Sequence, residues 1–160
     1  MVKPLIVYYS RTGKTRLVAE KLAAILDADI EQIVERKSRR GARAWFGGIK
    51  DVLLKRPAEL TSRHSTEGRS LILLGMPVWA SSPPPAVRAY LGAVDLASAN
   101  VAAFCTHDGG GGKRLFATLA ELLPRGLAES LEIKKPRPGD PRLDAALRDW
   151  AGRVKAGAAL

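Results

Sequence analysis

The stretch Tyr8-Tyr9-Ser10-Arg11-Thr12-Gly13-Lys14-Thr15 follows the apolar residues LIV and precedes a run with helical periodicity. It predicts a tight turn between a β-strand and an α-helix, rich in the hydroxyl groups of Ser10, Thr12 and Thr15. Such a turn offers backbone N–H groups and the positive end of a helix dipole, which suit an anion, while hydroxyl donors suit a single terminal phosphate. The alternative is a helix start that Ser or Thr caps, with nothing bound.

The same stretch ends like a nucleotide-triphosphate P-loop, which requires Gly-x-x-x-x-Gly-Lys-Ser/Thr. The position of the first glycine, counted back from Gly13, holds Tyr8. A bulky aromatic residue cannot adopt the conformations that glycine supplies there. In addition, no later apolar strand ends in the Asp that would help to hold Mg²⁺. These departures disfavour a P-loop nucleotide hydrolase, which we keep as an alternative.

The length and composition bound the class of protein. A chain of 160 residues with 46% hydrophobic residues predicts one domain over residues 1–160 with a real core. The longest nearly unbroken apolar run, LILLGMPVWA, is too short to cross a bilayer, and the N-terminus reads as a first strand and not as a signal peptide. We therefore expect a cytoplasmic protein. The single cysteine, Cys105, excludes an internal disulfide and lacks metal-site spacing, so we expect it in the core and predict no metal site.

The chain is strongly basic, with 26 Lys and Arg against 16 Asp and Glu, a net charge of +10 and an isoelectric point near 10.2. An acidic partner or surface is compatible with this charge. The densest cluster consists of Arg36, Lys37, Arg39, Arg40 and Arg43, just before Trp45 and Phe46. No helix-turn-helix, zinc or RNA-binding signature accompanies it, so a solvated basic face is favoured over nucleic-acid binding.

Short apolar runs alternate with stretches of helical period, which predicts βα units and a parallel sheet. The strands are expected at Leu5–Tyr9, Ile30–Val34, Leu71–Leu74, Val101–Cys105 and Leu131–Ile133. The apolar positions with helical spacing are Val18, Leu22, Ile25 and Leu26; Val87, Tyr90, Leu91 and Val94; Leu115, Leu119, Leu122 and Leu123; and Leu143, Leu147, Trp150 and Val154. Each set is expected to face the core.

The composition of the runs predicts the strand order. LIVYY, LILL and VAAFC are continuously apolar, as in strands buried on both faces, whereas IEQIV and SLEIK mix in polar residues, as at sheet edges. This predicts a doubly wound five-stranded α/β sheet with the order 2-1-3-4-5. The connections then leave strands one and three in opposite directions, and the crevice between their carboxyl ends is the expected ligand site.

Residues 35–66 are long for one connection. They contain basic, Gly-Gly and Pro elements around an amphipathic piece with Trp45, Ile49, Val52 and Leu53. A short or broken helix is expected there, since Gly47 and Gly48 weaken it. The segment is either a cover or contact surface, or an irregular surface excursion.

The loop after the third strand contains Trp79. It runs over Gly75, Met76, Pro77, Val78, Trp79, Ala80, Ser81 and Ser82, and ends in three prolines that fix the start of the next helix. An indole on such a stiff loop can lie against a planar ligand. The alternative is a core tryptophan, but small residues and prolines favour ligand contact.

The loop after the fourth strand is rich in glycine. Its residues are Thr106, His107, Asp108, Gly109, Gly110, Gly111 and Gly112. The glycines let the backbone approach a flat ligand closely and offer N–H donors to its rim; the alternative is a flexible turn. His107 and Asp108 could form an acid/base pair, although adjacent loop residues seldom point together. A turn suited to one phosphate, a tryptophan suited to a planar ring and a glycine-rich loop at the edge of that ring together fit flavin mononucleotide (FMN).

The chain resembles the flavodoxin-like family over nearly its whole length. The family's phosphate loop, Thr/Ser-x-Thr-Gly-x-Thr, matches Ser10, Thr12, Gly13 and Thr15. Its Gly-x-Pro-x-Trp loop before a helix that begins with proline matches Gly75, Pro77 and Trp79. Its Thr-x-x-Gly-rich third loop matches Thr106 and residues 109–112.

The resemblance implies noncovalent FMN binding at the carboxyl edge of the sheet. Ser10, Arg11, Thr12, Gly13, Lys14 and Thr15 would hold the phosphate, residues 77–80 one side of the ring, and residues 106–112 its other rim. The flavin would carry the chemistry, so no catalytic side chain is predicted.

The chain also departs from the family's electron carriers, which are acidic and usually place a second aromatic residue in the third loop. The family also contains quinone reductases and related flavin oxidoreductases. The excess of basic residues, with Arg11 and Lys14 near the phosphate, fits these enzymes at least as well as it fits the carriers. The expected activity is electron transfer with a redox partner protein, or NAD(P)H-dependent reduction of a small acceptor such as a quinone; a homodimer is also considered. The alternatives are a P-loop hydrolase and a basic binding module on a flavin-free scaffold.

Overall fold

The computed structural model describes residues 2–35 and 66–158. Within them, five parallel strands form one sheet in the order β2-β1-β3-β4-β5. The strands are β1 (Leu5–Tyr8), β2 (Asp29–Gln32), β3 (Leu71–Pro77), β4 (Asn100–His107) and β5 (Glu129–Lys134). The predicted α/β class and strand order are confirmed.

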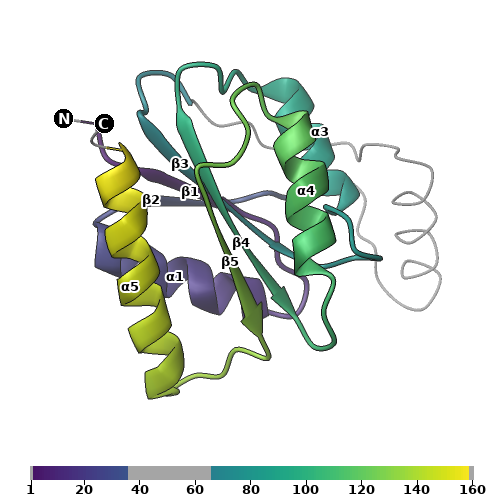
Figure 1. Cartoon of the computed structure of the whole chain (residues 1–160), viewed down its shortest axis with the longest axis vertical. Helices are drawn as coiled ribbons and strands as arrows, with labels where there is room; N and C mark the ends of the chain where they lie inside the picture. The colour runs from purple at the N-terminus through teal and green to yellow at the C-terminus, as the bar shows by residue number, and fades with distance from the viewer. Residues whose placement is uncertain (1, 36–65, 159–160) are drawn as a thin grey trace.

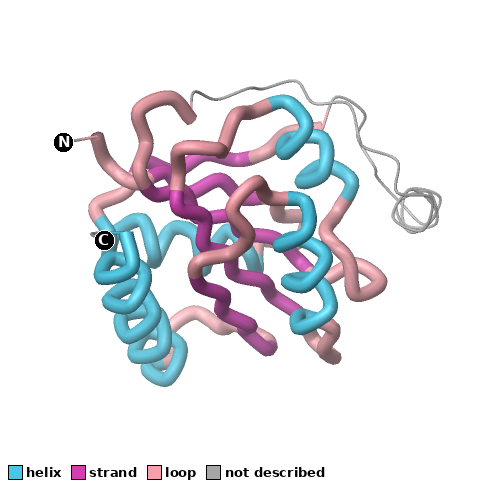
Figure 2. Tube along the Cα trace, turned by 45° about the horizontal axis from the view of Figure 1, so that its top comes forward, coloured by secondary structure: helices cyan, strands magenta, loops and turns pink. Residues whose placement is uncertain are grey.

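Helices cover both faces of this sheet. They are α1 (Lys14–Leu26), α3 (Pro85–Ala93), α4 (Gly112–Leu122) and α5 (Pro141–Ala158). α1 and α5 lie on one face, and α3 and α4 lie on the other (Figure 1). Figure 2 shows the twisted sheet between the two pairs. The connections from β1 and β3 therefore leave toward opposite faces, as a doubly wound sheet requires.

The continuous apolar run of β1 is explained by burial on both faces. Ile6 and Tyr8 pack in the cluster that includes α1 and α5, whereas Leu5 and Val7 pack in the cluster that includes α3 and α4. Successive strand side chains point to opposite faces, so each residue of a central strand enters one core or the other. Each such aliphatic side chain contributes about 1.5–3 kcal/mol of transfer free energy.

The edge strands differ from their predicted bounds. β2 covers Asp29–Gln32 and not Ile30–Val34, because it pairs only with β1 and ends where β1 ends. Ile30 and Val34 are accordingly exposed. β5 is longer at both ends than the predicted Leu131–Ile133, because it follows the extended β4.

β3 and β4 continue into segments that were predicted to be loops. β3 runs to Pro77 and β4 to His107, and the two pair in register up to Pro77 and Thr106. Gly75 permits this pairing, since a Cβ there would lie 2.2 Å from the ring atom Cζ of Phe104. Gly75 and Pro77 favour a loop by their local preferences, but both pair with β4 inside the sheet.

Two helices end earlier than predicted. Val94 and Leu123 adopt extended backbone conformations just beyond α3 and α4, and Leu122 is exposed where the apolar spacing predicted a core residue. Residues 36–65, which hold the basic cluster and most of the predicted covering segment, lie outside the described residues. In the described ranges, none of the helices is long and apolar enough to cross a membrane.

Candidate functional site

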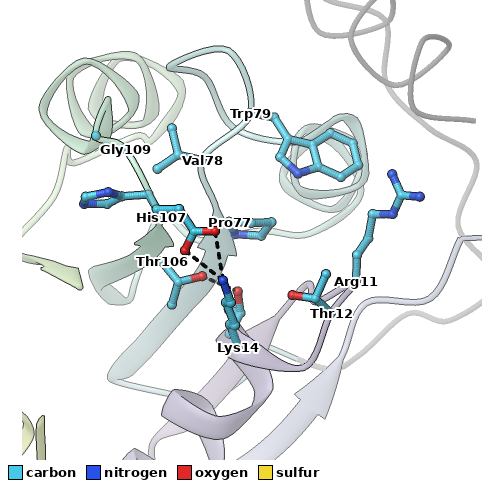
Figure 3. Close-up of a pocket in the computed structure, with 12 residues that line it drawn as sticks. Arg11, Thr12, Lys14, Pro77, Val78, Trp79, Thr106, His107 and Gly109 are labelled. Carbon is cyan, nitrogen blue, oxygen red and sulfur yellow. Dashed lines mark hydrogen bonds and ion pairs between the residues drawn. The ribbon is translucent and has the colours of Figure 1, made fainter. Parts of the chain in front are cut away.

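The loops that follow β1, β3 and β4 converge on a cavity of about 570 Å³ at the carboxyl edge of the sheet (Figure 3). Its lining residues are Arg11, Thr12, Lys14, Thr15, Pro77, Val78, Trp79, Thr106, His107, Asp108, Gly109 and Gly110. All of them belong to the three segments that the sequence selected. Ser10, Gly13, Ala80, Gly111 and Gly112 belong to the same segments but do not line the cavity.

The first segment presents a helix N-terminus to the cavity. Gly13 is the N-cap of α1, and within the described residues no side chain caps it. The hydroxyl oxygen of Ser10 instead accepts a hydrogen bond from the Gly13 N–H at 3.1 Å, which shapes the turn. The first turn of α1 contains no acidic residue. The Ser or Thr cap considered from the sequence is thus absent here, and the positive end of the dipole suits an anion.

Two threonine hydroxyls join the first and third segments. Thr15 Oγ1 and Thr106 Oγ1 lie 2.8 Å apart, and both residues are buried. A pair of hydroxyls has two protons, of which their mutual hydrogen bond uses one. The other proton can be donated to a ligand oxygen in the cavity.

Lys14 and Asp108 form an ion pair on the cavity wall (Figure 3). Lys14 Nζ lies 2.7 Å and 2.9 Å from the two carboxylate oxygens of Asp108. This hydrogen bond lowers the pKa of Asp108, with smaller electrostatic support from Lys135 and His107. The carboxylate is therefore ionised at neutral pH.

Trp79 both packs in the core and lines the cavity. It is 9% exposed, and the ring of Tyr9 meets it edge to face with 5.6 Å between ring centroids. The Arg11 guanidinium lies 5.6 Å from the centroid of the indole ring. Trp79 is therefore a core residue, as one of the two alternatives had it, and its place in the cavity lining leaves the predicted ligand contact open to it.

The loop of Trp79 turns tightly before α3. Trp79 and Ser82 exchange backbone hydrogen bonds, with Ala80 and Ser81 at positive φ angles between them. This turn directs Trp79 inward and keeps Ala80 out of the cavity lining. The sequence did not indicate it, because neither central residue is the glycine or asparagine that such a turn favours.

The side chains of His107 and Asp108 have different partners. His107 Nε2 donates to Glu132 Oε1 at 2.8 Å, while Asp108 binds Lys14. His107 Nδ1 is buried and has no hydrogen-bond partner among the described residues. The two residues therefore form no acid/base pair.

Glu132, which no sequence motif singles out, supports the third segment. Its Oε1 also accepts from the Gly112 N–H at 3.1 Å, which fixes the start of α4. A Cβ at Gly111, whose φ is 98°, would meet Ser81 Oγ at 2.8 Å, so this glycine lets the loops after β3 and β4 touch. The only sequence signal for Glu132 was a charged residue inside the mixed run SLEIK.

Cys105 is buried at the end of the core beside this site. Burial raises the pKa of its thiol to about 12, with Glu132 as a further cause. Within residues 2–35 and 66–158, no group of three or more His, Cys, Asp and Glu side chains could hold a metal ion.

A family model described as flavodoxin matches residues 3–129. The chain belongs to the flavodoxin family. No curated protein matches it significantly. For this flavodoxin-family protein, Tyr8 lies buried in β1 at the position where a P-loop needs its first glycine, which argues against the nucleotide-hydrolase alternative.

Solved structures similar to this flavodoxin-family chain agree with its fold. The structure of a protein from Bacteroides eggerthii has a TM-score of 0.79 at 21% identity, over 97% of this chain and 99% of that one. A Lactobacillus acidophilus flavoprotein, solved in complex with FMN, has a TM-score of 0.72 at 20% identity, over 94% and 99% of the two chains. Megasphaera elsdenii flavodoxin has a TM-score of 0.56 at 19% identity, over 93% and 98%.

Proposed function

We propose that this protein binds FMN noncovalently in the cavity formed by the loops after β1, β3 and β4, and that it acts as a redox protein. One observation carries the proposal: a single cavity combines a helix N-terminus suited to a phosphate with a tryptophan suited to a flat ring. The volume of about 570 Å³ lies within the range of small-molecule sites.

The residues present fit a phosphorylated, planar ligand. The N-terminus of α1, Lys14 and the spare proton of the threonine hydroxyl pair would hold the phosphate. Trp79 would contact the ring system, and Gly109 and Gly110 would let the backbone approach its rim. Family membership supports this assignment, as does the FMN named for the Lactobacillus acidophilus flavoprotein.

When bound, the flavin would supply electron or hydride transfer. The chain's own residues would bind it, orient it and exclude water from one side. His107 and Asp108 are engaged with Glu132 and Lys14, so neither is assigned an acid/base role.

For the reaction partners we propose two routes: electron transfer with a partner protein, or NAD(P)H-dependent reduction of a small acceptor such as a quinone. The net charge of +10 supports an acidic partner or an anionic co-substrate. Residues 36–65 hold much of this charge, with nine basic and two acidic residues. The cytoplasmic location and the homodimer stay predictions from the sequence.

The decisive experiment is a titration of the purified protein with FMN, followed by visible absorption and flavin fluorescence. We expect a shifted flavin spectrum and quenched fluorescence at micromolar protein. Riboflavin, which lacks the phosphate, is the control and should bind more weakly. An unshifted and unquenched spectrum would remove the proposal.

A second experiment separates the two routes. NADPH and a soluble quinone are added to the FMN-loaded protein without oxygen, and the flavin absorption is followed. Bleaching by NADPH and recovery with quinone would support the reductase. Slow bleaching by NADPH, with rapid exchange of electrons with a redox protein, would support the carrier.

A further inference from the structure

The ion pair between Lys14 and Asp108 joins the segment in which we placed the phosphate to the loop after β4. Lys14 is the first residue of α1, and Asp108 follows directly after β4. Both side chains line the cavity, and they meet with Nζ–oxygen distances of 2.7 Å and 2.9 Å (Figure 3). Their side chains are 43% and 61% exposed, so a ligand can reach the pair.

Lys14 stands at an unfavourable place for an isolated cation. The N-terminus of a helix is its positive end, where anions are stabilising and cations are not. The first turn of α1 offers no acidic residue of its own to compensate. The carboxylate of Asp108, which comes from the far end of another strand, supplies the anion that the helix start and Lys14 favour.

A phosphate monoester bound at the start of α1 would compete for the same cation. Aspartate brings one negative charge and two oxygens, whereas the phosphate of FMN brings close to two charges and three oxygens. The phosphate would therefore replace Asp108 as the partner of Lys14. Its binding free energy would be less favourable than with an unpaired lysine, because the ion pair with Asp108 must first be broken. Riboflavin has no phosphate and would leave the pair intact.

We propose that Asp108 is a specificity-determining residue of this cavity: its carboxylate holds Lys14 and sets how strongly the site favours phosphorylated over unphosphorylated ligands. The inference rests on the proposed FMN site and goes beyond it in assigning Asp108 an opposing role. Removal of the Asp108 charge frees Lys14 for the phosphate, so it strengthens FMN binding and raises the ratio of FMN affinity to riboflavin affinity.

The test compares four proteins: wild type, Asp108→Asn, Lys14→Met and the double variant. Each is titrated with FMN and with riboflavin at fixed ionic strength. We expect Asp108→Asn to tighten FMN binding roughly two- to fivefold, the range of an exposed ion pair. The ratio of FMN affinity to riboflavin affinity should rise as well, because only FMN carries the phosphate. Lys14→Met should weaken FMN binding and abolish the gain from Asp108→Asn.

A matched control separates this exchange from a general change of net charge. Lys3 Nζ and Asp27 Oδ1 form another exposed ion pair, also at 2.7 Å, whose residues do not line the cavity. Asp27→Asn removes the same charge and a similar pair. It should leave FMN affinity within the error of the wild-type value, and an equal gain in Asp27→Asn and Asp108→Asn would overturn the proposal.

Inorganic phosphate keeps this test independent of the proposed function. If no variant binds either flavin, the FMN proposal fails, and phosphate then decides the role of Asp108. Its binding is followed by the rise in melting temperature and by the NMR signals of the Lys14 side chain. A larger response in Asp108→Asn than in wild type supports the exchange, and an equal or smaller response overturns it.

Discussion

Thr15 Oγ1 and Thr106 Oγ1 lie 2.8 Å apart, although 91 positions separate the two residues in the sequence. The bond ties the first turn of α1 to the end of β4, across the strand β3 that lies between β1 and β4. Both residues are almost completely buried. The shape of the cavity wall therefore depends on the strand order, which brings these loops together.

Replacement of one of these threonines by valine should destabilise the protein. Thr15→Val keeps the shape of the side chain but leaves the buried hydroxyl of Thr106 without its partner. We expect the free energy of unfolding to fall by about 1–3 kcal/mol, the cost of an unsatisfied buried polar group. Urea unfolding of the flavin-free protein measures this change.

The double variant Thr15→Val/Thr106→Val completes the cycle. Because both polar groups are then absent, it should be more stable than the sum of the single variants implies. It should still bind FMN more weakly than wild type, since the spare hydroxyl proton is lost. Simple additivity of the two stability changes would show that the bond contributes nothing.

Trp79→Leu should affect both stability and binding. The change removes a buried ring that packs against Tyr9, so we expect a loss of about 2–4 kcal/mol in the free energy of unfolding. Loss of the aromatic face should weaken FMN binding by up to about tenfold. Trp150→Leu is the control: Trp150 is fully buried against Phe104 and does not line the cavity. It should cost similar stability without changing the affinity for FMN in the folded protein.

Gly75→Ala should destabilise the sheet. The added Cβ would lie within 3 Å of three ring atoms of Phe104, whose ring packs against Trp150. We expect about 1–3 kcal/mol of destabilisation from overpacking. Gly152→Ala in α5 is the counterpart, since a Cβ there meets nothing within 4 Å. It should stabilise the helix by up to about 1 kcal/mol, and thermal unfolding of both variants checks the opposite signs.

The thiol of Cys105 should not react with alkylating reagents in the native protein at pH 8. Burial raises its pKa to about 12 from an ordinary value of 9.0, so the native state keeps the proton that the unfolded state releases above pH 9. The free energy of unfolding should fall as the pH rises from 9 toward 12, by at most about 1.4 kcal/mol per pH unit from this group. Rapid labelling without denaturant would contradict the buried thiol.

Other buried groups besides Cys105 also lower the free energy of unfolding as the pH rises, and burial raises the pKa of Tyr8 among them. Burial also raises the pKa of Tyr90 to about 12, so this phenol acts in the same direction. Cys105→Ala removes the thiol's share and leaves that of Tyr90. The difference between the two pH profiles therefore isolates Cys105.

The sequence determined the class of the fold, the strand order and the three segments that line the cavity. The apolar runs of LIVYY, LILL and VAAFC are local patterns, and each central strand buries both faces wherever its neighbours lie. The carboxyl ends of parallel strands then share one edge of the sheet. For this reason, the three separate segments, which contribute cavity residues from Arg11 in the first to Gly110 in the third, are assigned to one site by the sequence alone.

Only the tertiary structure decided where the side chains of that site point. The side chain of His107 binds Glu132 on β5, and that of Asp108 binds Lys14 on α1. The side chains of these two adjacent residues therefore have partners on different elements. Trp79 packs against Tyr9 from another loop. These contacts join residues far apart in the chain, and their geometry depends on pairing register and packing, which no local sequence pattern contains. Local patterns placed the strands, and long-range contacts oriented the site.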